Sequence, residues 1–282
     1  MSSPNAKVSW FGRIFLGAGF LFLYLPIILL VVFSFNESRL SSSWSGFSFK
    51  WYGELMSDDS MLKAAWVSLK IAFTSATAAV VLGTLAALVM TRFKFFRGKT
   101  LFGALITAPL VMPEVVTGLS LLLMFVTLFS PFGISPKGML SIWIAHVTFT
   151  MAFVTVIISS RLAELDKSLE EAAMDLGANR LKIFFVITLP IIFPALISGW
   201  LLAFTLSLDD VVISSFVAGP DSTTLPMKIF STVRLGLNPK INALATIIVA
   251  VVSTTALIAW AISHREEKRR QRDIQLALQK GD

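Results

Sequence analysis

The chain of 282 residues contains no cysteine, which excludes disulfide bonds and thiolate metal sites. It has only two histidines, and no H-x-x-x-H, paired-cysteine or Ser-His-Asp arrangement is present. We therefore expect no metal site and no catalysis on a bound substrate. Charged residues are also scarce, at 15%, whereas 55% of the chain is hydrophobic. This composition is too apolar for a soluble domain and predicts a membrane protein.

Six apolar segments are long enough, or nearly so, to cross about 30 Å of hydrocarbon as helices. We expect these helices at Ile14–Phe35, Ile71–Thr91, Leu101–Phe129, Leu140–Ser160, Ile191–Phe216 and Ala243–Ser263. The fold class is therefore all-α, with six transmembrane helices. The first apolar run is longer than the core of a secretory signal and no A-x-A site follows it, so we expect it to be a retained anchor.

The basic residues indicate how the chain is oriented. A net charge of +7 could suggest a nucleic-acid partner, but Lys and Arg cluster at the ends of the apolar segments, and we expect none. One set of loops, with both termini, holds 16 of these residues, and the opposite set holds 7. Because basic residues collect on the cytoplasmic side, both termini and the loop containing Glu171 are predicted to be cytoplasmic.

That loop contains a short amphipathic pattern. Ser168 and Glu171 have the S-x-x-E spacing of a capping box, and Gly177 stands where a left-handed cap would end the helix. Spacings of i, i+3, i+4 and i+7 create one small apolar face, formed by Leu169, Ala172, Ala173 and Leu176. The acids off this face are Glu170, Glu171 and Asp175. The pattern predicts a helix of about two turns that fits a partner's groove, or an ordinary capped amphipathic helix.

The loop also carries a longer motif, running from Glu171 to Pro190: E-A-A, three residues, Gly, nine residues, then I-x-L-P. It resembles the signature of inner-membrane permease subunits of binding-protein-dependent, type I ABC importers. The resemblance implies that the short helix is a coupling helix that docks in a cleft of a separate ATPase. The implied coupling residues are Glu170, Glu171, Ala172, Ala173, Asp175, Leu176 and Gly177.

Other stretches are similar to the polyamine branch of this family, most of all to the second permease of the putrescine importer. They are Trp51–Leu55, Ala108–Glu114, Ala203–Asp210 and Asn242–Thr246. The resemblance implies a heterodimer with a sister permease, two copies of an ABC ATPase, and a periplasmic polyamine-binding protein, in the lipid of a bacterial inner membrane. It also implies that ATP and Mg are bound by the ATPase, with no cofactor on this chain.

The expected division of the chain follows the same resemblance. Residues 1–67 would form an anchor helix and a periplasmic segment, and residues 263–282 a basic cytoplasmic tail. Residues 68–262 would form the permease core, with the cytoplasmic coupling loop at 161–190. Gly98-Lys99-Thr100 resembles the end of a P-loop, but Phe93 occupies the place of its first glycine. Nucleotide chemistry must therefore come from a partner.

Three acids within apolar segments are candidates for the substrate path: Glu114, Asp209 and Asp210. Glu114 follows Pro109 and Pro113, which should break or kink its helix and allow it to line a cavity. Adjacent helical residues point about 100° apart, so one aspartate could bind a cation while the other caps or pairs. All three acids could instead be structural. His146 is expected to be a hydrogen-bonded residue of the helix bundle rather than a proton carrier.

The sequence therefore predicts a permease subunit of an ATP-driven importer for putrescine or a related polyamine, with no catalytic activity of its own. A permease of the same family for another solute is an alternative. An ion-coupled secondary carrier, with Glu114, Asp209 or Asp210 carrying protons or Na⁺, is a second. A membrane scaffold without transport is a third, although no feature of the sequence favours it.

Overall fold

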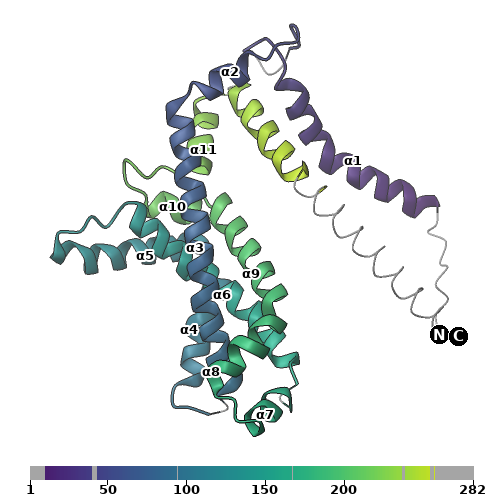
Figure 1. Cartoon of the computed structure of the whole chain (residues 1–282). Coiled ribbons are helices and arrows are strands. Elements are labelled where there is room, and N and C mark those ends of the chain that lie inside the picture. The colour runs from purple at the N-terminus through teal and green to yellow at the C-terminus, as the bar shows by residue number, and fades with distance from the viewer. Residues whose placement is uncertain are drawn as a thin grey trace, which may run out of the picture. The chain divides into compact units, whose positions relative to one another are not determined.

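The computed structural model describes residues 10–39, 43–93, 95–166, 168–236, 239–254 and 257. Within these residues the regular structure is helical, apart from one isolated antiparallel bridge between Asn36 and Phe47 (Figure 1). The predicted all-α class is therefore confirmed for this part of the chain. The chain divides into two compact units, one formed by Met1–Asp59 with Thr232–Asp282 and the other by Ser60–Ser231.

The first unit is formed by residues from both ends of the sequence. It contains α1 (Trp10–Phe33), α2 (Lys50–Met56) and a helix at Pro239–Thr254. Trp51 of α2 is 2% exposed and donates its indole N–H to the backbone oxygen of Asn36, at 2.7 Å. Lys240 lies 3.4 Å from the Asp58 carboxylate and so ties the helix at 239–254 to the end of α2.

The second unit holds the remaining helices. In chain order these are α3 (Asp59–Arg92), α4 (Lys99–Val111), α5 (Glu114–Phe129), η1 (Ser130–Phe132), α6 (Met139–Glu164), α7 (Ser168–Asp175), α8 (Arg180–Ile183), η2 (Phe184–Thr188), α9 (Leu189–Asp209), α10 (Val212–Val217) and α11 (Leu225–Leu235), whose last residues pass into the first unit. The central element is α6, which packs against α4, α5, α9 and α10.

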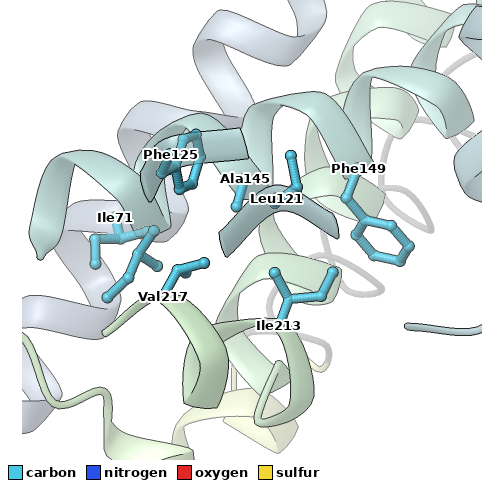
Figure 2. Packing of buried hydrophobic residues seen from close by; sticks show 8 residues of the cluster. Ile71, Leu121, Phe125, Ala145, Phe149, Ile213 and Val217 are labelled. Atoms are coloured by element: carbon cyan, nitrogen blue, oxygen red, sulfur yellow. The ribbon is translucent and has the colours of Figure 1, made fainter. Parts of the chain in front are cut away.

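Two buried clusters hold this unit together. The first joins α3, α5, α6 and α10 (Figure 2): Ile71, Leu121, Phe125, Ile142, Ala145, Phe149, Ile213 and Val217. The second joins α3, α6 and α9: Ala76, Ala79, Ala87, Val154, Ile158, Leu162, Ile192 and Ala203. Small residues let membrane helices approach closely. At Gly83 of α3, an added Cβ would lie 2.8 Å from the Val154 side chain of α6, so only glycine fits.

Five helices of the described chain are long and apolar enough to span a membrane. The first, second and fourth predicted segments are confirmed as α1, α3 and α6. The sixth is described only in part, as the helix at Pro239–Thr254, because most of its predicted second half lies outside the described residues. The count of six spans and the orientation stay predictions.

Two predicted segments are not continuous helices. The third is divided into α4 and α5, because the backbone is extended at Met112 and Pro113 carries no N–H, so the break predicted at the prolines is confirmed. The fifth was expected to run from Ile191 to Phe216. Instead the helix begins upstream at Arg180, ends at Asp209, and is followed by the separate helix α10.

Candidate functional site

The predicted coupling helix is present as α7, at one end of the second unit (Figure 1). Its N-terminal cap differs from the prediction, because Ser168 already lies inside the helix and cannot be its N-cap. The Asp166 carboxylate takes over, accepting the backbone N–H of Ser168 at 2.9 Å. This hydrogen bond lowers the pKa of the Asp166 carboxyl, because it stabilises the ionised form. The capping box of Ser168 and Glu171 was therefore wrong, although the helix begins where it was expected.

The end of α7 agrees with the sequence. Gly177 has φ +82°, the left-handed conformation that only glycine adopts readily. The N–H of Ala178 bonds to the carbonyl of Ala173 at 3.0 Å, and that of Gly177 to the carbonyl of Met174 at 2.9 Å. This pair of bonds is a Schellman motif, so the predicted glycine cap is confirmed. The cap turns the chain sharply and leaves α7 as a short, separate helix.

Most of the surface of α7 is uncovered. Leu169 is 48% exposed and Leu176 is 89% exposed, while Ala172 is exposed and Ala173 half-buried. Off this apolar face, Glu171 and Asp175 are also exposed. An exposed apolar face rimmed by carboxylates is a surface that a protein partner could cover.

Glu170 is placed differently from the other two acids of α7. Its Oε1 accepts hydrogen bonds from Arg92, at the end of α3, and from Thr188, at the end of η2, at 2.5 and 3.0 Å. Its carboxylate therefore faces the rest of the unit, although the sequence grouped it with the exposed coupling residues. Sequence reasoning missed these contacts because the partners lie 78 and 18 residues away. The one available signal was Thr188, a polar residue at the x position of the I-x-L-P motif, which could donate a hydrogen bond to an acid.

Two of the three candidate path acids are exposed, and each stands at a helix end. Glu114 opens the first turn of α5, directly after the break at Pro113. Asp209 is the last residue of α9. No hydrogen bond or ion pair joins Glu114 to Asp209 or Asp210 in the part of the chain that the structure describes. Both carboxylates are exposed in the single chain.

Asp210 caps and pairs, as the sequence allowed for one of the two aspartates. It accepts the backbone N–H groups of Ile213 and Ser214, at 3.1 and 2.7 Å, and so caps the start of α10. Its Oδ2 also lies 3.2 Å from Nε2 of His146. The backbone of Asp210 is extended, with φ −65° and ψ 125°, so α9 ends before it and does not continue to Phe216. The Asp210 carboxylate then holds N–H groups in the first turns of α10.

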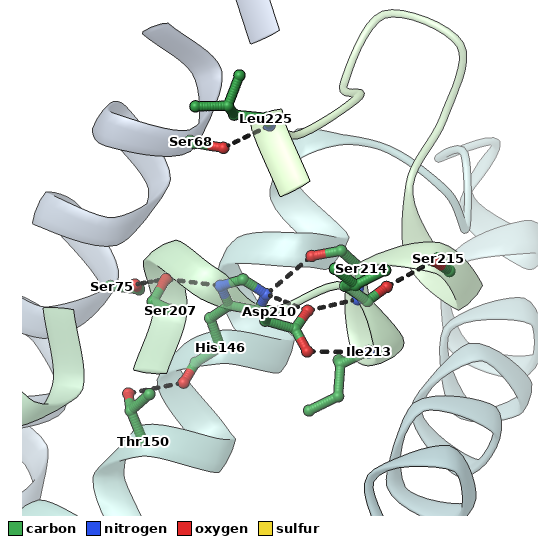
Figure 3. Close-up of polar contacts among 11 residues, drawn as sticks. Ser68, Ser75, His146, Thr150, Ser207, Asp210, Ile213, Ser214, Ser215 and Leu225 are labelled. Atoms are coloured by element: carbon green, nitrogen blue, oxygen red, sulfur yellow. Dashed lines mark hydrogen bonds and ion pairs between the residues drawn. The ribbon is translucent and has the colours of Figure 1, made fainter. Parts of the chain in front are cut away.

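His146 is the centre of a buried polar network (Figure 3). It is 1% exposed, with Nδ1 2.6 Å from the Ser207 hydroxyl and Nε2 3.1 Å from that of Ser214. Ser207 continues to Ser75 at 3.1 Å, so the network joins α3, α6, α9 and α10. The prediction that His146 is a hydrogen-bonded residue of the bundle is confirmed.

A model of the binding-protein-dependent transport system inner membrane component family matches residues 79–269. This chain belongs to that family. The matched stretch contains α7 and all the candidate path acids. An inner-membrane component with several apolar helices of spanning length is a multi-pass membrane protein. The family match and the exposed helix α7 thus support the same class of protein, a membrane component of a transport system.

Named relatives are similar over nearly the whole chain. The putrescine transport system permease protein PotI of Escherichia coli K12 is 62% identical over 92% of this chain and 92% of its own length. The spermidine/putrescine transport system permease protein PotC of the same strain is 44% identical over 90% of this chain and 94% of its own. PotC of Haemophilus influenzae is 43% identical, over 90% and 98%.

Solved structures of two ABC transporters contain chains whose fold is similar to that of this protein. A chain of the bacterial alginate ABC transporter in complex with an alginate pentasaccharide-bound periplasmic protein aligns with TM-score 0.68 at 16% identity, over 88% of this chain and 91% of that chain. A chain of the inward-facing MetNI methionine ABC transporter aligns with TM-score 0.57 at 14% identity, over 71% and 92%. These alignments therefore confirm the expected permease fold.

Proposed function

We propose that this chain is the permease subunit of an ATP-driven ABC importer for putrescine or a related polyamine. The observation that carries the proposal is α7, a capped signature helix that stands uncovered at one end of the helical core. The substrate class is supported by the similarity to PotI and PotC, whose names specify putrescine and spermidine transport. The complete unit would contain a sister permease, two ATPase copies and a periplasmic binding protein, in a bacterial inner membrane.

The exposed surface of α7 would dock in a cleft of the ATPase. Ala172, Ala173 and Leu176 supply the apolar contact, Glu171 and Asp175 the charged rim, and Gly177 ends the helix. ATP binding closes the ATPase dimer and pulls α7, which moves the core from an inward-open to an outward-open state. The binding protein then releases its cargo, and hydrolysis resets the inward state. ATP and Mg are held by the ATPase, and this chain catalyses no reaction.

The path for the polyamine would use Asp209 and Glu114. Polyamines carry ammonium groups, which bind carboxylates and the faces of aromatic rings. Both acids are exposed and both stand where a helix is broken, which suits residues lining a cavity in a membrane. Asp210 follows Asp209 directly and so lies beside the proposed path. It would not contact the polyamine itself, because its carboxylate is bonded to His146 and to a backbone N–H of α10.

The test is uptake of labelled putrescine, spermidine and an unrelated solute by the assembled complex in proteoliposomes. We expect uptake of a polyamine that requires ATP and the binding protein and does not respond to proton or Na⁺ gradients. Uptake driven by an ion gradient without ATP would overturn the proposal in favour of an ion-coupled carrier. Uptake of the unrelated solute alone would leave the importer class standing but exclude a polyamine substrate.

In the same assay, Asp209→Asn should reduce polyamine uptake about tenfold, because a charge-assisted hydrogen bond to an ammonium group contributes about 1.5–3 kcal/mol. Asp221→Asn is the matched control, since Asp221 is an exposed acid in the loop between α10 and α11. We expect it to transport like the unmodified protein. Equal uptake by both variants would show that Asp209 does not contact the substrate.

A further inference from the structure

One carboxylate of α7 is bonded to the core rather than exposed. The Glu170 and Arg92 side chains are each 19% exposed, and their contact of 2.5 Å is charge-assisted. Thr188, which donates its hydroxyl to the same oxygen, is 2% exposed. Surface ion pairs stabilise little because water screens them, but a mostly buried pair with a second donor is held in one geometry. Glu170 therefore fixes the place of α7 on the unit.

The two partners of Glu170 come from different helices of the core. Arg92 is the last residue of α3, where a cation is also favoured by the helix dipole. Thr188 is the last residue of η2 and directly precedes α9. Both α3 and α9 contribute to the buried cluster around α6. One oxygen atom thus connects α7 to two packed helices at once.

The path of the chain between these residues explains how Glu170 and Thr188 meet. After the cap at Gly177, Asn179 accepts the N–H of Lys182 at 2.8 Å and starts a new helix at Arg180. Thr188 lies eight residues beyond Arg180, about two helical turns along. The last of these turns is the π-helix η2, a geometry often found at functional sites. The chain therefore returns to α7 before entering the core as α9.

We propose that Glu170 is a positioning residue that transmits the movement of α7 to α3 and α9. The inference rests on the proposed function, because it assumes that an ATPase moves α7. It assigns Glu170 a role separate from the docking surface formed by Glu171, Asp175 and the apolar face. A pull on α7 reaches the core through the bonds to Arg92 and Thr188 as well as through the chain itself.

The experiment uses the assembled complex with Glu170→Gln, with Arg92→Gln, and with the exchanged pair Glu170→Arg and Arg92→Glu. We expect both single variants to retain the ATPase on purification and to hydrolyse ATP, but to transport about fivefold less polyamine per ATP, since a neutral bond replaces a charge-assisted one. The exchanged pair should recover at least half of this ratio. Glu164→Gln is the control, because among the described residues Glu164 pairs with Arg161 on its own helix, at 3.0 Å.

Amide hydrogen exchange of residues 168–176 gives a readout that does not depend on transport. Both single variants should exchange faster there than the unmodified chain, and the exchanged pair should return toward it. Unchanged exchange and an unchanged transport-to-ATP ratio would overturn the proposal. Loss of ATPase binding in Glu170→Gln would also overturn it, by placing Glu170 on the docking surface. If the unmodified complex shows no ATP-driven uptake, the proposed function fails, whereas the exchange measurement still tests whether the bonds of Glu170 to Arg92 and Thr188 hold α7 in place.

Discussion

Replacing Glu171 with lysine is expected to abolish transport-coupled ATP hydrolysis while leaving membrane insertion intact. Glu171 is exposed on α7, beside the apolar face that would enter the ATPase. Reversing a charge at the rim of a docked helix opposes the partner's complementary charge. We expect the hydrolysis stimulated by the loaded binding protein to fall at least tenfold, and less ATPase to be recovered when the complex is purified.

The matched control is Glu164→Lys. Glu164 is also an exposed acid near this end of the unit, but it lies on α6 and outside α7. The same reversal of charge there should leave stimulated hydrolysis close to that of the unmodified complex. Normal stimulation in Glu171→Lys, or an equal loss in both variants, would contradict the docking of α7.

The second large effect is expected on stability, from His146→Ala. The imidazole lies 1% exposed between Asp210, Ser207 and Ser214. Removing it leaves a cavity and takes a hydrogen-bond partner from the buried polar groups around it, and leaving such a group without a partner typically costs about 1–3 kcal/mol. We therefore expect a lower thermal unfolding temperature for the purified subunit in detergent.

Thr148→Ala provides the comparison. Thr148 lies on the same helix, but within the described part of the chain its hydroxyl bonds to the carbonyl of Ile144 one turn earlier, at 2.8 Å, and to no other helix. This substitution should change the unfolding temperature little. If His146→Ala unfolded at the same temperature as Thr148→Ala, the network in Figure 3 would not be a stabilising centre of the bundle.

Features set by neighbouring residues were predictable from the sequence. The end of α7 at Gly177 needs only a residue that tolerates positive φ, and the break before Glu114 needs only a proline without an N–H. The apolar runs of α1, α3 and α6 were likewise long enough to be identified. Local chemistry decides each of these features.

Features set by distant contacts were not predictable. The sequence could not show that Asp210 meets His146, 64 residues away, or that α9 ends just before Asp210. It could not separate Glu170 from Glu171 either, since both stand off the apolar face of α7 and only folding brings Arg92 to one of them. In both places two adjacent acids with similar surroundings in the sequence take different roles in the fold.

The absence of native cysteine allows a direct measurement at α7. In Ala172→Cys, a single thiol stands on the exposed part of the helix, where a short bifunctional reagent can link it to a neighbouring protein. We predict that it cross-links to the ATPase in the assembled complex and that a membrane-impermeant thiol reagent does not reach it from the periplasmic side. Labelling from that side, or a complex active in ATP-driven uptake without any cross-link to the ATPase, would contradict the account.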